Sequence, residues 1–171
     1  SSLPHDLVVG PQGRIWVTAF FNDEIWALSP DTGAIEAFPI NEDPDTLAQV
    51  RALEFDPNGR LKILLGGTSA VVDFDPETGA YQTFDAGMYG HSLALDRQGN
   101  IWFNDYFGKP ERLGRIDGKT GDLSVHTMPS ANLTEAEGLP LPYGLQIDQD
   151  DILWNTSLAS NQLVRFDTRT G

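Results

Sequence analysis

The sequence predicts an all-β protein built from four similar consecutive units, and three observations lead to this prediction. A turn motif, Gln-Gly-Arg-Ile-Trp at 12–16, returns with variations at 58–62, 98–102 and 150–154. A second turn motif follows each of these and ends at Gly33, Gly79, Gly121 and Gly171. Short runs rich in β-branched and aromatic residues lie between the turns, and almost no segment shows a helical stripe.

The first unit shows why each element is expected. An apolar run at 7–9 precedes a tight turn in which Gly13 supplies a positive φ. A second strand is expected at 15–19 and a third at 25–28, before the turn Pro30-Asp31-Thr32-Gly33. An alternating segment at 35–40 completes four strands.

The other three units repeat this order. Strands are expected in the second unit at 52–55, 61–65, 71–74 and 81–84, and in the third at 92–95, 101–104, 113–116 and 123–127. The fourth unit has expected strands at 144–147, 152–156 and 163–166 and stops before its fourth. Helical turns are plausible only at 48–52 and 133–136, both within loops.

Four-stranded units of roughly 40–50 residues indicate the blades of a β-propeller. A β-sandwich is the alternative, but it does not predict the same turn chemistry at the same place in every unit. We therefore expect one partial propeller over 1–171, with blades at 3–40, 50–85, 90–128 and 142–171, the last incomplete. Because an open stack leaves apolar faces wet, a six- or seven-bladed ring is expected, completed by a longer parent chain or by self-association.

The charge balance excludes several classes of partner. The chain has 25 acidic and 11 basic residues, a formal net charge of −14, so we expect no binding to nucleic acid. No run of eighteen apolar residues occurs, so no membrane insertion is expected. The composition, which includes no cysteine, suits a secreted or periplasmic protein and leaves a cytoplasmic one open.

Two long loops, at 41–50 and 128–141, are expected as insertions on one rim. The first carries Glu42, Asp43 and Asp45, which could hold Ca²⁺. Solvated loop acids are the alternative interpretation of these three residues.

One equivalent position in each unit carries a large polar side chain. Counting back eight residues from the turn residues 13, 59, 99 and 151 gives His5, Arg51, His91 and Tyr143. In a propeller the inner strands begin at one face, so these four side chains should surround one central opening. The alternative is that each only caps the channel and satisfies backbone groups.

Neighbouring loops add aromatic and acidic groups to the predicted opening. The aromatic candidates for ligand contact are Phe20, Phe21, Tyr89, Tyr106 and Phe107. A concave site with aromatic walls and a few convergent polar groups typically takes a small molecule or a peptide loop. Asp105 lies near His91 in the prediction, and a carboxylate beside an imidazole could share a divalent cation or a proton.

Three further positions are interpreted structurally. Trp16, Trp102 and Trp154 lie between apolar neighbours on second strands and are expected in the core between blades. Lys62 takes the tryptophan position in the second unit, which suggests an exposed face there. His126, on an outer strand, is expected to be solvated.

Several stretches resemble the blade motif of the virginiamycin B lyase (streptogramin lyase) family of seven-bladed propellers. They are Pro4-His5-Asp6-Leu7, Gly99-Asn100-Ile101-Trp102-Phe103 and Pro142-Tyr143-Gly144-Leu145. The resemblance extends blade by blade over the whole chain, and NHL-repeat and gluconolactonase-type propellers share much of it.

The resemblance implies a lyase that opens a cyclic ester by elimination, using a bound Mg²⁺, inner-strand histidines and a nearby glutamate. His5 and His91 match the histidine position and become the candidate catalytic residues. Leu3 and Tyr89, however, stand two residues before these histidines, where a glutamate is expected.

Three functions therefore stay open. The first is a binding module for a small molecule or a partner's loop. The second is a metal-assisted lyase or lactonase, with His91 as base and Asp105 or His5 near the metal. The third is a structural interaction domain. No nucleophile elbow, His-Glu-x-x-His, P-loop or Gly-x-Gly-x-x-Gly motif is present to decide between them.

Overall fold

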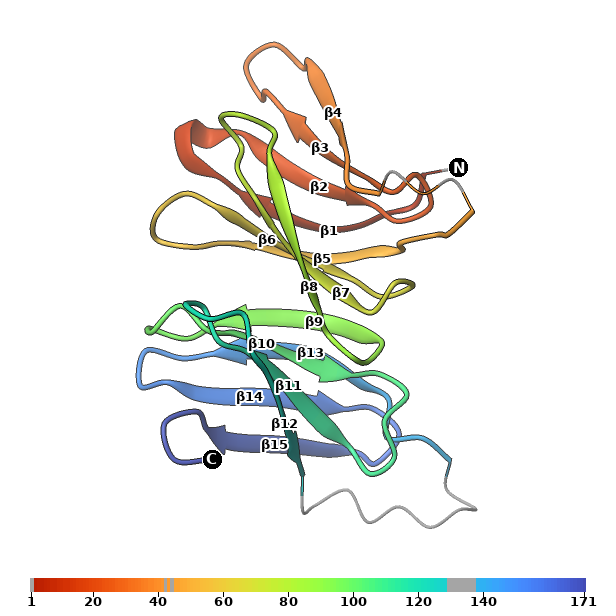
Figure 1. The fold of residues 1–171 in the computed structure, drawn as a ribbon, viewed down its shortest axis with the longest axis vertical. Coiled ribbons are helices and arrows are strands. Elements are labelled where there is room, and N and C mark those ends of the chain that lie inside the picture. Colours follow the sequence, from red (N-terminus) through yellow and green to blue (C-terminus); the bar gives the residue numbers. More distant parts are fainter. Residues whose placement is uncertain (1, 42, 44, 129–137) are drawn as a thin grey trace. The chain divides into compact units, whose positions relative to one another are not determined.

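The protein is an all-β chain, described here by a computed structural model (Figure 1). The structure describes residues 2–41, 43, 45–128 and 138–171. The chain divides into two compact units, unit 1 (Ser1–Asp85) and unit 2 (Ala86–Gly171), each made of two sheets. Every sheet is antiparallel and joins strands in sequence order, as expected for propeller blades.

Unit 1 contains two complete four-stranded blades. Blade 1 consists of β1 (Pro4–Val9), β2 (Ile15–Ala19), β3 (Glu24–Leu28) and β4 (Ile35–Pro39). Blade 2 consists of β5 (Val50–Phe55), β6 (Leu61–Leu65), β7 (Ala70–Phe74) and β8 (Tyr81–Asp85). The inner strands β1 and β5 contact each other, so the two blades pack as neighbours.

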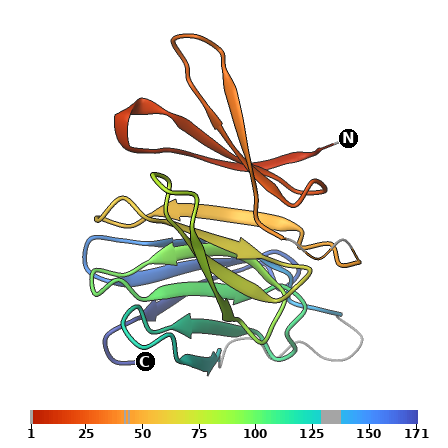
Figure 2. The same ribbon diagram turned by 45° about the horizontal axis from the view of Figure 1, so that its top comes forward.

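Unit 2 contains one complete blade and one of three strands. Blade 3 consists of β9 (Gly90–Leu95), β10 (Ile101–Asp105), β11 (Arg112–Ile116) and β12 (Leu123–Thr127). Blade 4 consists of β13 (Pro142–Ile147), β14 (Ile152–Ser157) and β15 (Gln162–Asp167). The inner strands β9 and β13 contact each other. Figure 2 shows the strong twist of the individual sheets.

The turns adopt the backbone conformations that the repeats predict. Gly13, Gly59 and Gly99 have φ values of 76°, 81° and 82°, and Asp151 at the same position has 58°. In the second turn motif, the four glycines at 33, 79, 121 and 171 also have positive φ. The repeated turn chemistry is thus confirmed, because this region favours glycine and is tolerated by aspartate.

Every inner strand carries a β-bulge close to its start. In each blade the pairing register between the inner strand and the second strand shifts at one place. The shift lies between Pro4 and Leu7, between Val50 and Ala52, between Gly90 and Leu93, and between Pro142 and Leu145. The inner strands therefore begin two or three residues earlier than the alternation pattern predicts. A bulge interrupts that pattern and re-aims the extra side chain.

Tryptophans form the centre of two blade interfaces, as expected. Trp16 is 2% exposed and packs against Phe38, Phe55 and Phe74 in unit 1. Trp102 is 1% exposed and packs against Phe166 in unit 2. Trp154 is half-buried.

The expectation that Lys62 marks an exposed face is wrong. Lys62 is 8% exposed, and its Nζ lies 2.6 Å from Asp73 Oδ1 and 3.2 Å from Asp56 Oδ2. Burial is possible because two carboxylates neutralise the ammonium group.

The expectation that His126 is solvated is also wrong. Its ring packs against Trp102 and Phe166, with centroids 5.3 Å from each, and its buried Nε2 has no hydrogen-bond partner. Burial, with a smaller contribution from Arg115, lowers the pKa of His126 below its ordinary value.

The described parts of the loops add no long helix. Residues 48–52 form no helical turn, because β5 begins at Val50. The other expected turn, at 133–136, lies outside the described residues, as does Glu42 of the acidic loop. In the described part of the chain, no helix is long and apolar enough to cross a membrane.

Candidate functional site

In unit 1, the bulges bring His5 and Arg51 into direct contact. The His5 Nδ1 lies 2.8 Å from the carbonyl oxygen of Arg51, and Arg51 Nη1 lies 3.3 Å from His5 Nε2. Because a carbonyl only accepts, Nδ1 carries the proton, and Nε2 accepts from the guanidinium. The partners thus assign the neutral Nδ1–H tautomer to His5.

Aromatic rings flank this pair. The Phe20 ring stacks on His5 with a centroid separation of 5.8 Å, and the Arg51 guanidinium carbon lies 4.8 Å from the Phe20 centroid. Phe21 packs edge-on against Phe20 at 4.8 Å and is largely exposed. The four candidates of unit 1 therefore form one cluster, in which a cation and an imidazole lie beside an exposed aromatic ring.

In unit 2, the bulges bring His91 and Tyr143 together in the same way. Their ring centroids are 4.2 Å apart, and His91 Nδ1 lies 3.2 Å from the carbonyl oxygen of Tyr143. Ser92 Oγ also donates to that carbonyl, at 2.5 Å. His91 is buried, whereas the Tyr143 side chain is 51% exposed.

The other aromatic candidates of unit 2 extend this cluster. Tyr106 stacks on His91 with a ring-centroid separation of 4.9 Å, and Phe107 packs edge-on against Tyr106 with a centroid separation of 4.9 Å. Tyr89 lies 4.9 Å from Phe107. Since Phe107 is 50% exposed, the cluster presents an apolar aromatic surface.

A side-chain oxygen holds the bulge in three of the four blades. Thr18 Oγ1 and Thr156 Oγ1 accept from the backbone N–H of Asp6 and Gly144, each at 2.8 Å. Asn104 Oδ1 accepts from the N–H of Ser92 at 2.9 Å. These bonds compensate for the ladder hydrogen bonds that a bulge interrupts, and they fix the direction of the bulged residue.

A buried polar network lies behind the cluster of unit 2. Asn104 Nδ2 donates to Asn155 Oδ1 at 3.0 Å, and Asn155 Nδ2 donates to Glu111 Oε1 at 2.6 Å. Ser157 Oγ donates to Glu111 Oε2 at 2.9 Å. Glu111 is 0% exposed, and burial raises the pKa of its carboxyl despite these two hydrogen bonds.

Asp105, the candidate metal ligand, forms an ion pair. It is buried, and its Oδ2 accepts from Arg112 Nε at 2.8 Å and from Arg112 Nη2. Among the described residues, no group of three or more histidine, aspartate and glutamate side chains is placed to hold a metal ion. The Mg²⁺ or Ca²⁺ site therefore stays a prediction.

Sequence reasoning missed the aspartates that start the first turn of three blades. Asp96 Oδ2 and Asp148 Oδ2 each accept from a tryptophan Nε1 at 2.9 Å, from Trp102 and Trp154 respectively. Asp56 binds Lys62 in the same way. The signal was present, because each aspartate stands three residues before the turn residue, where blade 1 has Gly10.

Glu111 and Asn155 were also missed. Neither belongs to a repeated motif, so nothing in the repeat pattern marks them. Only the packing of blade 3 against blade 4 brings them together.

The fold is shared with enzymes of the β-propeller class. The chain matches a catalytically inactive virginiamycin B lyase from Staphylococcus aureus, solved with quinupristin, at 19% identity and a TM-score of 0.82. That match covers 99% of this chain and 54% of the lyase. A gluconolactonase from Xanthomonas campestris matches at 17% identity and a TM-score of 0.72, over 100% of this chain and 60% of that one.

A curated protein is similar over part of the chain. It is a probable peptidyl-alpha-hydroxyglycine alpha-amidating lyase of Caenorhabditis elegans, 29% identical over 103 residues, which are 57% of this chain and 29% of that protein. No family model matches the sequence. The chain thus spans about half the length of the lyase structure and less than a third of the curated relative. The comparisons confirm the propeller fold and its resemblance to these lyases and lactonases.

Proposed function

We propose that the protein binds a small molecule at the bulged ends of its inner strands. The observation that carries this proposal is the pairing of bulged side chains within each unit, His5 with Arg51 and His91 with Tyr143. Both pairs lie beside partly exposed aromatic rings. Such surfaces combine stacking with a few directed polar groups, as ligand sites typically do.

The chemistry of the two clusters favours a ligand with a flat or apolar body and at least one hydrogen-bond acceptor. Phe21, Phe107 and Tyr143 offer exposed ring surface, and Arg51 offers a guanidinium. The names of the relatives suggest two probes that carry such acceptors, quinupristin and gluconolactone. Both are cyclic esters with several carbonyl or hydroxyl oxygens.

The test is calorimetric titration of each probe into the full chain, with mass spectrometry of the mixture afterwards. Tyr143→Ala and Arg51→Gln should each weaken binding about ten-fold, which corresponds to loss of about 1.4 kcal/mol of contact. Leu163→Ala, an exposed site on β15, is the matched control and should leave binding unchanged. Equal affinities in all four proteins would contradict the proposal.

A metal-assisted lyase or lactonase is the second candidate, and the matched position of His91 favours it. Arg112 engages Asp105, so His5 or another donor would have to hold the metal in this candidate. Ring-opened product that disappears in His91→Ala and after chelation would support this candidate. Binding without product supports the binding module, and absence of both supports the structural role.

A further inference from the structure

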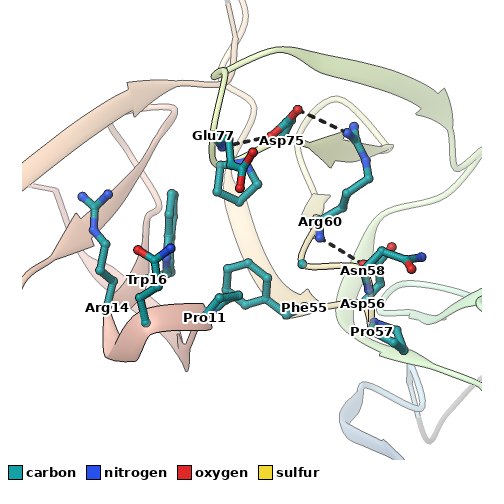
Figure 3. Close-up of a pocket in the computed structure, with 13 residues that line it drawn as sticks. Pro11, Arg14, Trp16, Phe55, Asp56, Pro57, Asn58, Arg60, Asp75 and Glu77 are labelled. Carbon is teal, nitrogen blue, oxygen red and sulfur yellow. Dashed lines mark hydrogen bonds and ion pairs between the residues drawn. The ribbon is translucent and has the colours of Figure 1, made fainter.

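A pocket lies in unit 1 at the opposite end of the inner strands, away from the bulges. Its volume is about 730 Å³, and residues of the first turns of blades 1 and 2 line it. Figure 3 shows Arg14 and Trp16 of blade 1 on one side, and Arg60, Asp75 and Glu77 of blade 2 on the other. Phe55 and three prolines add apolar wall.

The corresponding place in unit 2 is occupied by the chain itself. Asp96 is buried there, and its Oδ2 accepts from Trp102 Nε1 at 2.9 Å and from Asn100 Nδ2 at 2.8 Å. A buried carboxylate thus satisfies the indole N–H of the blade interface. Its position in the repeat is three residues before the turn glycine.

Blade 1 lacks this carboxylate, although blade 2 of the same unit keeps it as Asp56. Gly10 stands at the position of Asp96, and Arg14 stands at that of Asn100. A Cβ on Gly10 would lie 2.6 Å from the Phe55 ring and 2.8 Å from Trp16 Cδ1, so this site excludes a side chain. Blade 1 has therefore lost the internal anion and carries Arg14 at the same interface, where its Nη2 pairs with the exposed Glu36 at 2.8 Å.

The Trp16 indole nitrogen consequently lacks an acceptor. Trp16 lines the pocket although it is 2% exposed, and among the described residues none accepts a hydrogen bond from its Nε1. Trp102 and Trp154, by contrast, both donate to an aspartate. The pocket wall thus carries an indole donor without a protein acceptor, and an acceptor atom of a ligand would satisfy it.

The charges around the pocket indicate what that ligand carries at each end. The Arg14 guanidinium carbon lies 5.4 Å from the Trp16 ring, so a carboxylate at the indole edge would also meet a cation. On the blade 2 side, Glu77 is exposed and forms no ion pair with another described residue. The negative charge of Glu77 favours an ammonium group at this far end of the ligand.

We propose that this pocket binds a small zwitterion, such as an amino acid or a short peptide. Its carboxylate accepts from Trp16 Nε1 and pairs with Arg14, and its ammonium group lies toward Glu77. The apolar body contacts Pro11 and Phe55. This site is separate from the bulge clusters and does not depend on the function proposed for them.

Three probes of equal chain length test the proposal: 6-aminohexanoate, hexanoate and hexylamine. Each is titrated into ¹⁵N-labelled full chain while the indole N–H resonances are followed, with that of Trp16 assigned from Trp16→Phe. We expect 6-aminohexanoate to shift the Trp16 resonance downfield in a saturable way, and to bind more tightly than either single-charge probe. No saturable shift of this resonance, or hexanoate binding as tightly as 6-aminohexanoate, would overturn the proposal.

Two charge variants assign the ends of the ligand. Arg14→Gln should weaken 6-aminohexanoate and hexanoate about ten-fold, because a charge-assisted hydrogen bond is lost. Glu77→Gln should weaken 6-aminohexanoate but tighten hexanoate, since the repulsive carboxylate is gone. Equal effects of Glu77→Gln on both probes would contradict the assigned orientation.

A transplant of the unit 2 interface gives an independent test. Ile147 stands in blade 4 where Phe55 stands in blade 2, so Gly10→Asp with Phe55→Ile rebuilds the arrangement around Asp96. The internal carboxylate should move the Trp16 resonance downfield without ligand and abolish 6-aminohexanoate binding. Phe55→Ile alone measures the loss of that apolar contact and should leave a weaker but still saturable shift with 6-aminohexanoate. Retention of full affinity in the double variant contradicts the proposal.

Discussion

Units 1 and 2 each pack two neighbouring blades around a tryptophan, yet they satisfy that tryptophan differently. In unit 2, Asp96 accepts from the turn backbone and from Trp102 Nε1, so one carboxylate joins turn and core. In unit 1, Gly10 replaces it, and a pocket lies beside Trp16. The comparison teaches that the repeat fixes the strands and turns but not the acceptor of the interface tryptophan. The chain supplies that acceptor in unit 2, and in unit 1 we propose that a ligand does.

Blade 2 shows a third solution at the same place. Lys62 replaces the tryptophan, and Asp56 retains its role as acceptor while Asp73 supplies a second carboxylate. The aspartate therefore serves an indole in blades 3 and 4 and an ammonium group in blade 2.

The largest expected effect comes from removing that ammonium group. Lys62→Met leaves Asp56 and Asp73 facing each other with only Arg60 as counter-charge, so we expect a loss of about 3 kcal/mol in the free energy of unfolding. Urea denaturation measures it. An unchanged midpoint would show that the ion cluster contributes nothing to unit 1.

A matched pair of substitutions isolates the tryptophan hydrogen bond. Trp102→Phe and Trp16→Phe remove similar ring volume, but only Trp102 donates to a buried carboxylate. We expect Trp102→Phe to cost about 1.5–3 kcal/mol more in the free energy of unfolding than Trp16→Phe. Equal losses in the two variants would mean that the interfaces do not differ in the way described.

Glu111 should make unit 2 less stable as the pH rises. Its folded-state pKa is raised above 4.5, so the folded chain holds the proton at pH values where the unfolded chain has lost it. The resulting stability is present below pH 4.5 and is lost as the pH rises through the folded-state pKa. One proton gives a slope of at most about 1.4 kcal/mol per pH unit.

The measurement is the difference in urea midpoint between the native chain and Glu111→Gln, from below pH 4.5 to above the folded-state pKa. The native midpoint should fall with rising pH relative to that of the variant. Parallel curves would contradict the assignment.

The smallest expected effect concerns Arg14. Its Nη2 pairs with Oε2 of the exposed Glu36 at 2.8 Å, whereas Asn100, its counterpart in unit 2, is buried. Glu36→Gln should change the free energy of unfolding by about 0.5 kcal/mol or less, because exposed ion pairs contribute little. Thermal or urea unfolding of the native chain and the variant measures this change. A larger loss would show that Arg14 is held more tightly than its exposure indicates.

Much of the fold could be predicted because turns with positive φ need particular residues. Gly59 and Gly99 marked the first turns, and their strands followed within one or two residues. The starts of the inner strands were predicted too late, since a bulge at His5 or His91 breaks the alternation that defines a strand in the sequence.

The candidate site was predicted in part for the same reason. Equivalent positions in adjacent repeats must lie together when the blades pack, which placed His5 beside Arg51 and His91 beside Tyr143. Glu111 and the buried state of Lys62 could not be predicted. Both depend on partners, Ser157 and Asp73, that only three-dimensional packing identifies.

The bulges have a consequence for how such a chain can change. Each inserts a residue that takes no regular place in the hydrogen-bonded ladder, so its side chain can be exchanged without altering strand pairing. Four repeats have accepted an imidazole, a guanidinium, an imidazole and a phenol at this point. Recognition can thus diversify one repeat at a time, while the architecture that carries it stays the same.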